Sequence, residues 1–264
     1  MNLPATTVPE LTERRLRKKV PTLYEADASK YAGPNRLQIN PVAKWFRQWM
    51  RPSAYSQWLH QAFAQVDVVG REHLQQINGP CVFIANHASH LDTLLVDEAL
   101  PATLRRRTFF GAAQDRWFVK GKKKRVLQPW YQSLVLGNFP ILRGGGKDAL
   151  SYAHWLLQKQ QCVFLFPEGT RATGDNLGEF KHGATMLALQ HDIPVVPIYL
   201  HGAQAARPKG QREVVQGRAT VEILKPIHFS AGSDTAQATA HLFERMNRVH
   251  HRYRKVTAKL EQAA

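Results

Sequence analysis

The chain has 264 residues, which suits one domain of ordinary size, and 44% of them are apolar, enough for a sizeable core. Its 36 Lys and Arg against 20 Asp and Glu give a net charge of +16, which predicts acidic partners such as anionic lipid, phosphorylated metabolites, nucleic acid or an acidic protein. The two cysteines exclude a disulfide framework, and no run approaches the roughly 18 uncharged apolar residues of a membrane span.

The cysteines and the first residues indicate the compartment. Cys81 and Cys162 each lie in an apolar run, CVFIA and CVFLF, which predicts buried thiols in a reducing, cytoplasmic setting. The opening MNLPATTVPELTERRLRKK lacks the apolar core of a signal peptide. Any membrane role would then be peripheral, so we expect a cytoplasmic protein on the inner face of a membrane.

Residues 1–39 are expected to form a polar N-terminal arm. They contain four prolines and a basic cluster from Arg14 to Lys19. This composition is typical of a loosely attached segment.

Residues 40–65 have the pattern of an amphipathic helical hairpin. Asn40 is a candidate N-cap, and Pro41 suits the first helical position. One apolar face then recurs with helical period, at Val42, Trp45, Phe46, Trp49 and Met50. The cations Lys44, Arg47 and Arg51 lie off that face. Pro52 and Ser53 are expected to separate this helix from a second one, which carries Trp58, Leu59, Ala62 and Phe63.

This hairpin has two interpretations. Tryptophans with nearby cations are typical of an interfacial helix, whose rings lie at headgroup level and whose charges face anionic lipid. The same periodicity is equally typical of a hairpin packed on its own domain. The three tryptophans and the cations favour a membrane anchor.

Residues 66–264 are expected to form the main domain. Its strand candidates are apolar runs at 66–69, 81–86, 108–112, 139–142, 162–166, 194–200 and 219–224. Helical patterns lie near 71–78, 91–100, 128–136, 147–160 and 181–191, and a long helix follows near 235–262. The alternation predicts an α/β fold with a mixed, largely parallel sheet flanked by helices, preceded by the N-terminal amphipathic segment.

The first motif with chemical potential is Asn86-His87-Ala88-Ser89-His90-Leu91-Asp92, directly after an apolar run. In α/β folds, ligands bind where strands end at their carboxyl edge. If the chain turns between His87 and Asp92, the carboxylate can hold one ring nitrogen and leave the other as a base. A helix-capping cluster with a surface histidine is the structural alternative. A metal site is disfavoured, because the spacing is not that of a helical zinc motif.

Three further motifs follow strands or begin helices. Phe166-Pro167-Glu168-Gly169-Thr170-Arg171 combines a flexible glycine with a planar cation suited to phosphate or carboxylate. Arg143 ends the run Gly137-Asn138-Phe139-Pro140-Ile141-Leu142-Arg143, before three glycines. Phe180-Lys181-His182-Gly183 stands at a predicted helix start, which favours an anion. Each is also compatible with an ordinary turn, but together they fit a single cleft at one sheet edge.

This set of motifs resembles the glycerolipid acyltransferase superfamily, which includes glycerol-3-phosphate and lysophosphatidic acid acyltransferases. The family's Asn-His-x4-Asp block is matched at 86–92, and its Phe-Pro-Glu-Gly-Thr-Arg block is matched in full at 166–171. Its Gly-to-Arg block is similar to 137–143, and its Val-Pro-x-x-Pro-Val strand is similar to 193–198. The blocks occur in the family's order, and the similarity covers about residues 66–228.

The resemblance implies roles for the site residues. His87 would be the general base and Asp92 its orienting partner. Acceptor and phosphate binding would involve Arg143, Glu168, Gly169, Thr170, Arg171 and Lys181. The resemblance implies no cofactor and no metal, and it implies transfer from acyl-coenzyme A or acyl carrier protein to a glycerolipid-type hydroxyl, such as that of lysophosphatidic acid.

One segment departs from many lysophosphatidic acid acyltransferases, which carry a lysine after the next strand. Here the segment reads Gly111-Ala112-Ala113-Gln114-Asp115-Arg116-Trp117-Phe118, more similar to domains with the pattern Ala-x-Asp-Tyr-Phe-Phe. Either Arg116 replaces the missing cation, or the acceptor is not a phosphomonoester.

The expected mechanism is direct transfer by general-base catalysis. The chain contains no Gly-x-Ser-x-Gly nucleophile motif, so we expect no acyl-enzyme. His87 would take the proton of the acceptor hydroxyl, and the thiolate leaving group departs readily because thiol pKa values are about 8.5.

A basic segment between Leu104 and Leu127 is expected to contact an anionic membrane, coenzyme A phosphates or acyl carrier protein, or else to be a solvated loop. Its cations are Arg105, Arg106, Arg107, Arg116, Lys120, Lys122, Lys123, Lys124 and Arg125. A nucleic-acid-binding protein is a rival interpretation, but no zinc-finger spacing or RNA-recognition signature occurs. A silent membrane scaffold and a hydrolase that uses the same dyad on water are two further functions compatible with the motifs.

Overall fold

All seven apolar runs form strands of one sheet in the computed structural model, which describes residues 34–118, 128–144, 146–172, 174, 176–206 and 215–263. The strands are β1 (Phe63–Val69), β2 (Val82–Ala85), β3 (Thr108–Ala113), β4 (Asn138–Ile141), β5 (Cys162–Leu165), β6 (Val195–His201) and β7 (Gly217–Ile223).

The strand order is β1-β7-β6-β2-β5-β3-β4. Five strands, from β6 to β4, run in parallel, while β7 pairs with β6 in the antiparallel sense and β1 runs parallel to β7. This confirms the expected α/β fold with a mixed, largely parallel sheet. The carboxyl ends of β2, β5, β3 and β4 therefore share one edge, where the candidate motifs are expected to meet.

Both faces of the sheet are covered. Along β2, Phe83 and Ala85 belong to the apolar core on one face, while Val82 and Ile84 belong to the core on the other. The first core includes residues of α3 (Asp92–Ala99), and the second includes residues of α6 (Ser151–Gln158) and α7 (Gly183–His191). Burial on both faces explains why the central strands are apolar throughout instead of alternating.

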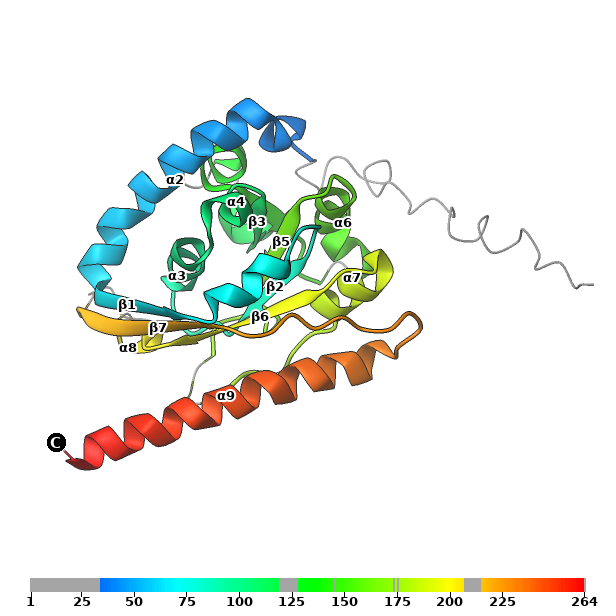
Figure 1. The fold of residues 1–264 in the computed structure, drawn as a ribbon. Coiled ribbons are helices and arrows are strands. Elements are labelled where there is room, and N and C mark those ends of the chain that lie inside the picture. Colours follow the sequence, from blue (N-terminus) through cyan, green and yellow to red (C-terminus); the bar gives the residue numbers. More distant parts are fainter. Residues whose placement is uncertain are drawn as a thin grey trace, which may run out of the picture.

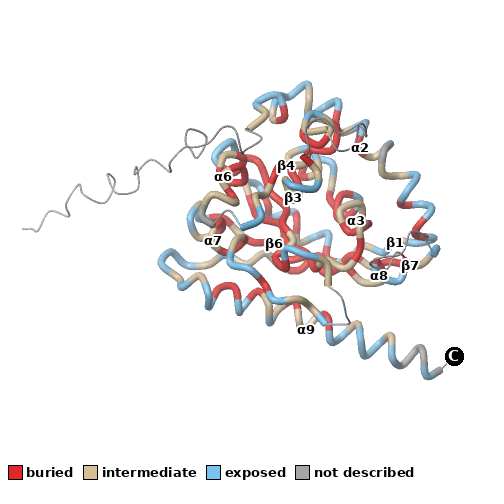
Figure 2. The backbone as a smooth tube through the Cα atoms, turned by 180° about the vertical axis from the view of Figure 1, so that it is seen from behind, coloured by how far each residue is buried: buried red, intermediate tan, exposed pale blue. Residues whose placement is uncertain are grey.

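The remaining elements are mostly short. They are η1 (Arg36–Ile39), η2 (Arg71–Gln76), α4 (Ala102–Arg105), α5 (Gln114–Trp117), the π-helical η4 (Tyr131–Leu136), η5 (Gly146–Leu150) and α8 (Ala203–Ala206). Two long helices, α2 (Pro41–Ala62) and α9 (Thr235–Ala263), lie on opposite sides of the sheet (Figure 1). Figure 2 shows the buried residues gathered in the sheet and on the inner sides of the helices.

The expected hairpin at 40–65 is wrong. One continuous helix, α2, spans Pro41–Ala62 with Pro52 inside it, and Phe63 already belongs to β1. A proline in a helix interior costs about 3 kcal/mol because it removes a hydrogen bond and crowds the preceding turn. Polar contacts of Arg47 and Arg51 before Pro52, and burial of Leu59 and Ala62 after it, hold both halves to the domain.

The orientation of α2 places its arginines inward and its aromatic face outward. Trp45 and Trp49 are 59% and 64% exposed, whereas Arg47 and Arg51 are 1% and 2% exposed. Arg51 forms a 2.6 Å ion pair with Asp97 of α3, and Arg47 donates to the carbonyl oxygens of Leu134 and Gln38. The apolar stripe is therefore left uncovered by the described part of the domain.

The end of the expected N-terminal arm is packed on the domain. Gln38 in η1 is buried, its side-chain amide donates to the carbonyl of Asn138, and its Oε1 accepts from the Tyr152 hydroxyl. The rest of the arm, residues 1–33, lies outside the described residues. Within the described chain, no helix is long and apolar enough to cross a membrane.

Candidate active site

The first motif begins where β2 ends. The Asn86 side chain is buried and bridges to β6, because its Nδ2 donates to the Leu200 carbonyl at 3.0 Å and its Oδ1 accepts from the Leu200 N–H at 2.7 Å. These two hydrogen bonds satisfy the backbone N–H and C=O groups of Leu200, which the short strand β2 leaves without a partner. It fixes the backbone from which the His87 side chain projects.

His87 and Asp92 meet as the spacing predicts. The chain turns between them, so that His87 Nδ1 lies 2.8 Å from Asp92 Oδ2. Asp92 is fully buried at the start of α3, and the same oxygen accepts from the N–H groups of Ala88 and Ser89 at 2.7 and 2.9 Å. The ring of His87 stacks on Phe166 with 3.9 Å between centroids. These contacts fix the imidazole, and Nε2 is the ring nitrogen left for proton transfer.

Glu168 braces the loops instead of lining the cavity. Its Oε1 accepts from the backbone N–H of His87 at 2.7 Å, and its Oε2 accepts from Gly178 at 2.8 Å. Burial raises the pKa of this carboxyl, while the two N–H donors act in the opposite direction. In this structure Glu168 therefore links its own motif, Phe166–Arg171, to the Asn86–Asp92 motif, and its contact with substrate stays a prediction.

Lys181 lies against Gly169. The glycine has φ +68, a left-handed conformation, and a Cβ there would lie 2.9 Å from Lys181 Nζ. The Lys181 N–H donates to the carbonyl of Pro167 at 2.9 Å, which links the segment before α7 to the Phe166–Arg171 motif. The loop thus needs glycine both for its backbone and for the ammonium that crosses it.

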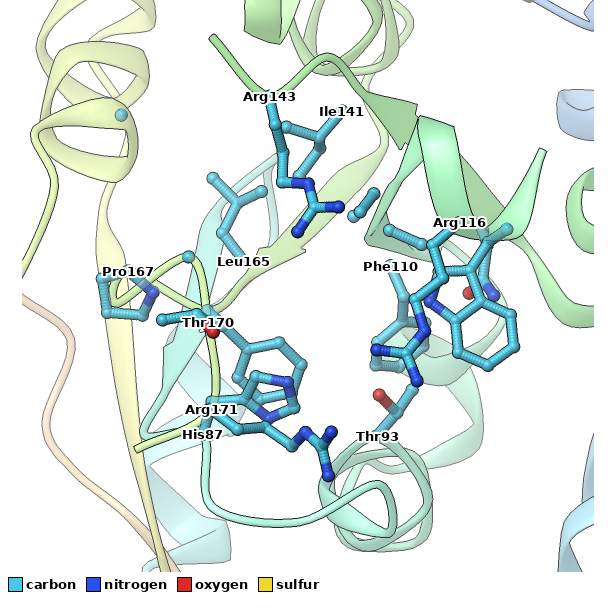
Figure 3. A pocket seen from close by; sticks show the side chains of 18 of the residues that line it. His87, Thr93, Phe110, Arg116, Ile141, Arg143, Leu165, Pro167, Thr170 and Arg171 are labelled. Carbon is cyan, nitrogen blue, oxygen red and sulfur yellow. The ribbon is translucent and has the colours of Figure 1, made fainter. Parts of the chain in front are cut away.

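A cavity of about 920 Å³ collects the predicted residues. Its wall includes His87, Arg143, Gly169, Thr170, Arg171 and Lys181, while Asp92 and Glu168 lie behind the wall. Figure 3 shows Arg116, Arg143 and Arg171 around the central space, with His87 beside them. Three strand ends and the start of α7 contribute, so the four motifs do form one cleft.

The charged side chains of this cavity are almost all cationic. Arg116 lines it and lies 3.5 Å from His90, so a cation is present on the wall of this cavity although the family's lysine is missing. Arg143 forms an ion pair with Asp115 of α5, and this guanidinium holds the pKa of Asp115 below its usual range. Both side chains of the pair remain more than half exposed.

Most of the remaining wall is apolar, and residues of α2 contribute to it. Tyr55 and Trp58 of α2 line it together with residues of β3, η4 and β5, namely Phe110, Gly111, Leu136 and Leu165. The sequence did not predict this contribution of α2, because the spacing of Tyr55 and Trp58 along a helix does not show which cavity the helix covers. A polar end beside His87 and a long apolar remainder fit an amphiphilic molecule.

Gly137 leaves space for two buried arginines of α2, a role that its sequence motif did not indicate. It has φ +71, and a Cβ there would lie 2.8 Å from Arg51 Nη2 and 3.0 Å from Arg47 Cδ. The glycine therefore makes room for the buried arginines of α2, and the arginine at the other end of the motif, Arg143, reaches the cavity.

Part of the expected basic segment falls outside the described residues, namely Lys120, Lys122, Lys123, Lys124 and Arg125. In the described ranges, no group of three or more His, Cys, Asp or Glu is arranged to hold a metal ion.

The family model described as Acyltransferase matches residues 65–201, just over half of the chain. The chain belongs to this acyltransferase family. The matched range contains the His87–Asp92 pair, Glu168 and the Gly169–Lys181 contact, so the family match covers the cavity except for the residues that α2 contributes.

Curated relatives share the region of these residues at about one-third identity. The chloroplastic 1-acyl-sn-glycerol-3-phosphate acyltransferase BAT2 of Brassica napus is 33% identical over 174 residues, which are 64% of this chain and 46% of the relative. The 1-acyl-sn-glycerol-3-phosphate acyltransferase alpha of Homo sapiens is 31% identical over 170 residues, 62% and 55% of the two chains. The chain spans about half the length of the curated relatives it matches.

A solved structure shares the fold. The 1-acyl-sn-glycerophosphate (LPA) acyltransferase PlsC from Thermotoga maritima superposes with a TM-score of 0.61 at 22% identity, covering 79% of each chain. The family model and the curated relatives confirm the expected superfamily, and this solved structure supports its fold.

Proposed function

We propose that this protein is an O-acyltransferase that moves a fatty acyl chain from an acyl thioester to a hydroxyl of a 1-acyl-sn-glycerol-3-phosphate-type acceptor. The observation that carries the proposal is the position of His87, which lines a cavity with cationic and apolar walls while its Nδ1 lies 2.8 Å from the buried Asp92. The names of the relatives support the acceptor class.

The proposed reaction is a direct transfer. His87 Nε2 removes the proton of the acceptor hydroxyl as the oxygen attacks the thioester carbonyl carbon. The tetrahedral intermediate collapses, the carbon–sulfur bond breaks, and the thiolate takes the proton from His87. Asp92 fixes the tautomer and stabilises the imidazolium that forms between these steps.

Phosphate recognition is assigned to the cations of the cavity. Arg171 and Arg143 provide planar guanidinium groups suited to phosphate oxygens, and Lys181 adds an ammonium at the start of α7. Arg116 takes the place of the lysine found in many lysophosphatidic acid acyltransferases. We therefore favour a phosphate-bearing acceptor over an uncharged one.

We assign the apolar part of the cavity to an acyl chain. The donor is acyl-coenzyme A or acyl carrier protein, both of which present an acyl thioester beside acidic groups that suit the net charge of +16.

We further propose that the protein works peripherally on an anionic membrane. The uncovered aromatic stripe of α2 supports this, because exposed tryptophans beside cations suit the headgroup region. This assignment retains the membrane interpretation of residues 40–65 in a single helix with its apolar face outward.

Acyl transfer by the purified protein tests the proposed function. Both thioester donors would be offered with lysophosphatidic acid, glycerol 3-phosphate, lysophosphatidylcholine and diacylglycerol, and products would be identified by mass spectrometry. We expect a diacyl product from lysophosphatidic acid, lost at least 100-fold in His87→Ala. His90→Ala is the matched control from the same motif and cavity wall, and it should lose less than tenfold.

Three outcomes would contradict the proposal. Free fatty acid as the only product would indicate a hydrolase. A stable acyl adduct on a serine or cysteine would exclude direct transfer. Equal losses in the two histidine variants would remove His87 from its assigned role.

A further inference from the structure

The hydrogen bond to Asp92 does not by itself fix the plane of the His87 ring. It holds only Nδ1, at 2.8 Å, and the His87 side chain is 20% exposed on the wall of the cavity. The second torsion of a histidine side chain has a broad minimum, and a carboxylate oxygen accepts hydrogen bonds over a wide range of directions. A ring held at one nitrogen can therefore pivot and displace Nε2, the atom that must meet the acceptor hydroxyl.

Phe166 provides a second restraint on this ring. Its phenyl group lies nearly parallel to the imidazole, with 3.9 Å between the two centroids and 16° between the two planes. Phe166 directly follows β5, whereas His87 follows the neighbouring strand β2, so the contact joins two parts of the cavity wall. Asp92 fixes one edge of the imidazole and Phe166 fixes one face, and together they leave Nε2 a single direction.

The ring of Phe166 is itself held by its neighbours. Its carbonyl oxygen accepts from the N–H of Gly169 at 3.0 Å, which closes the turn after β5. Its ring meets Phe164 of β5 at 4.8 Å between centroids and 87° between planes. Phe164 is fully buried and contacts Phe110 of the next strand, β3, at 5.2 Å between centroids. Buried aromatic rings of two adjacent strands therefore support the surface on which His87 stacks.

The stack also changes in strength during the proposed reaction. While His87 is neutral, the two rings attract each other as a stacked aromatic pair. Once Nε2 has taken the proton of the acceptor hydroxyl, the ring is a cation over the negative face of the phenyl group, at a distance well inside the range of about 6 Å over which such pairs attract. An interaction that is stronger in the charged state than in the ground state accelerates the reaction.

We propose that Phe166 is a positioning residue of the transfer reaction, which fixes the plane of His87 and stabilises the imidazolium that exists between the two proton transfers. The proton passes from the acceptor hydroxyl to Nε2 and then to the departing thiolate, so His87 ends neutral and the phenyl group is unchanged. This inference rests on the proposed function and assigns a role to the first residue of the Phe166–Arg171 motif.

Steady-state kinetics of two Phe166 variants test the proposal. Phe166→Leu removes the aromatic face at a similar volume and should lower kcat roughly 10- to 30-fold. KM for the acceptor should change less than about threefold, because the lost interaction belongs to the charged intermediate. Phe166→Tyr keeps an aromatic face and should retain kcat within about threefold.

Phe243→Leu is the matched control. Phe243, on α9, forms an edge-to-face pair with Phe180 at 5.3 Å, and it does not line the catalytic cavity. Its replacement removes one ring of a comparable pair and should change kcat less than about twofold. Circular dichroism establishes that each variant is folded. A folded Phe166→Leu protein with kcat within threefold of the wild type would overturn the proposal, as would an equal loss in Phe166→Tyr.

Proton magnetic resonance gives a readout that does not depend on turnover. The proton on Nδ1 of His87, shared with Asp92 at 2.8 Å, should give a strongly deshielded resonance that is absent from His87→Gln. We expect this resonance in the wild type and in Phe166→Tyr, and its loss through exchange with water in Phe166→Leu. A merely structural role that leaves the ring in place would keep the resonance, so its persistence in Phe166→Leu would overturn the positioning role.

The two measurements also separate this inference from the proposed function. Absence of transfer by the wild-type protein to every acceptor would overturn the proposed function, while the resonance would still decide whether Phe166 holds the imidazole. Transfer by the wild type together with an unaffected Phe166→Leu protein would overturn the role of Phe166 and leave the proposed function in place.

Discussion

The side chain of Lys181 crosses Gly169 so closely that a Cβ on the glycine would lie 2.9 Å from the ammonium nitrogen and 3.0 Å from Cε. The glycine and the lysine come from different motifs, and a Cβ on the glycine would push the end of the lysine side chain aside. This contact defines how the cationic end of the cavity is shaped.

Gly169→Ala is therefore expected to displace Lys181 as well as to strain the loop. The left-handed backbone alone costs about 1 kcal/mol for a residue with a Cβ. We expect KM for the phosphate-bearing acceptor to rise about tenfold, with a smaller effect on kcat. Steady-state kinetics against Gly79→Ala, where a Cβ meets no atom within 4 Å, provide the comparison. Similar kinetics for both variants would contradict the close contact.

Asp92→Asn is expected to reduce kcat roughly 100- to 10,000-fold with little change in KM. The amide keeps the size of the side chain but no longer stabilises the imidazolium or selects the tautomer of His87. Asp92→Ala should in addition destabilise the fold, because two backbone N–H groups lose their acceptor. Retention of activity within threefold in a folded Asp92→Asn protein would remove the dyad from the mechanism.

Asp115→Asn should strengthen acceptor binding by freeing Arg143. The pair is more than half exposed, so its loss is worth at most about 1 kcal/mol, or roughly a fivefold lower KM for lysophosphatidic acid. Arg143→Gln should raise the same KM. Opposite effects of the two variants, measured at low and high salt, would confirm the competition; effects of the same sign would contradict it.

Because α2 packs with its arginines inward and its tryptophans outward, we expect the arginines, and not the tryptophans, to stabilise the fold. Arg51→Ala leaves Asp97 as an unpaired buried charge and should cost about 3–5 kcal/mol. Trp45→Ser/Trp49→Ser removes exposed rings and should change the unfolding free energy by less than about 1 kcal/mol. Urea unfolding followed by circular dichroism measures both. The reverse ranking would mean that the aromatic face packs on the domain.

Acid should destabilise the protein through His154, a buried histidine that contacts the partly buried His191. His154 Nδ1 lies 2.8 Å from His191 Nε2, and burial, with a smaller contribution from His191, lowers the pKa of His154 to about 4. In the unfolded chain the pKa of this histidine returns to its ordinary value of 6.5, so the unfolded state binds a proton at a higher pH than the folded state does. The stability of the fold is therefore unaffected by this group above pH 6.5 and falls as the pH decreases from 6.5 toward 4. The melting temperature of His154→Gln should depend less on pH across this window than that of the wild type. Identical pH profiles would contradict this source of acid sensitivity.

The strands and the dyad could be predicted from sequence because their signals are local. Apolar runs such as 162–166 indicate strands buried on both faces, and the four residues between His87 and Asp92 are enough for a turn. The orientation of α2 could not be predicted in this way. Periodicity shows that Trp45 and Trp49 share a face, but the partner that draws Arg51 inward is Asp97, 46 residues away.

Two site assignments needed tertiary contacts for the same reason. Glu168, beside a glycine and an arginine at a strand end, has the sequence setting of a substrate ligand, and only its bonds to the N–H groups of His87 and Gly178 show that it braces the loops. The pairing of Arg143 with Asp115 joins two segments 28 residues apart. For both residues the side-chain type indicated a polar role near the site. The partner that each side chain binds depends on tertiary contacts that the sequence does not show.

Gly137 links a catalytic-domain motif to a helix outside that domain's matched range. Because a Cβ at this position would lie 2.8 Å from Arg51 Nη2 and 3.0 Å from Arg47 Cδ, we expect the three positions to change together during evolution. Relatives that keep long side chains at both arginine positions should keep glycine, and relatives with asparagine, which tolerates a left-handed backbone, should carry shorter residues at those positions. The residue at position 137 should therefore indicate which relatives have a helix like α2 with two buried arginines.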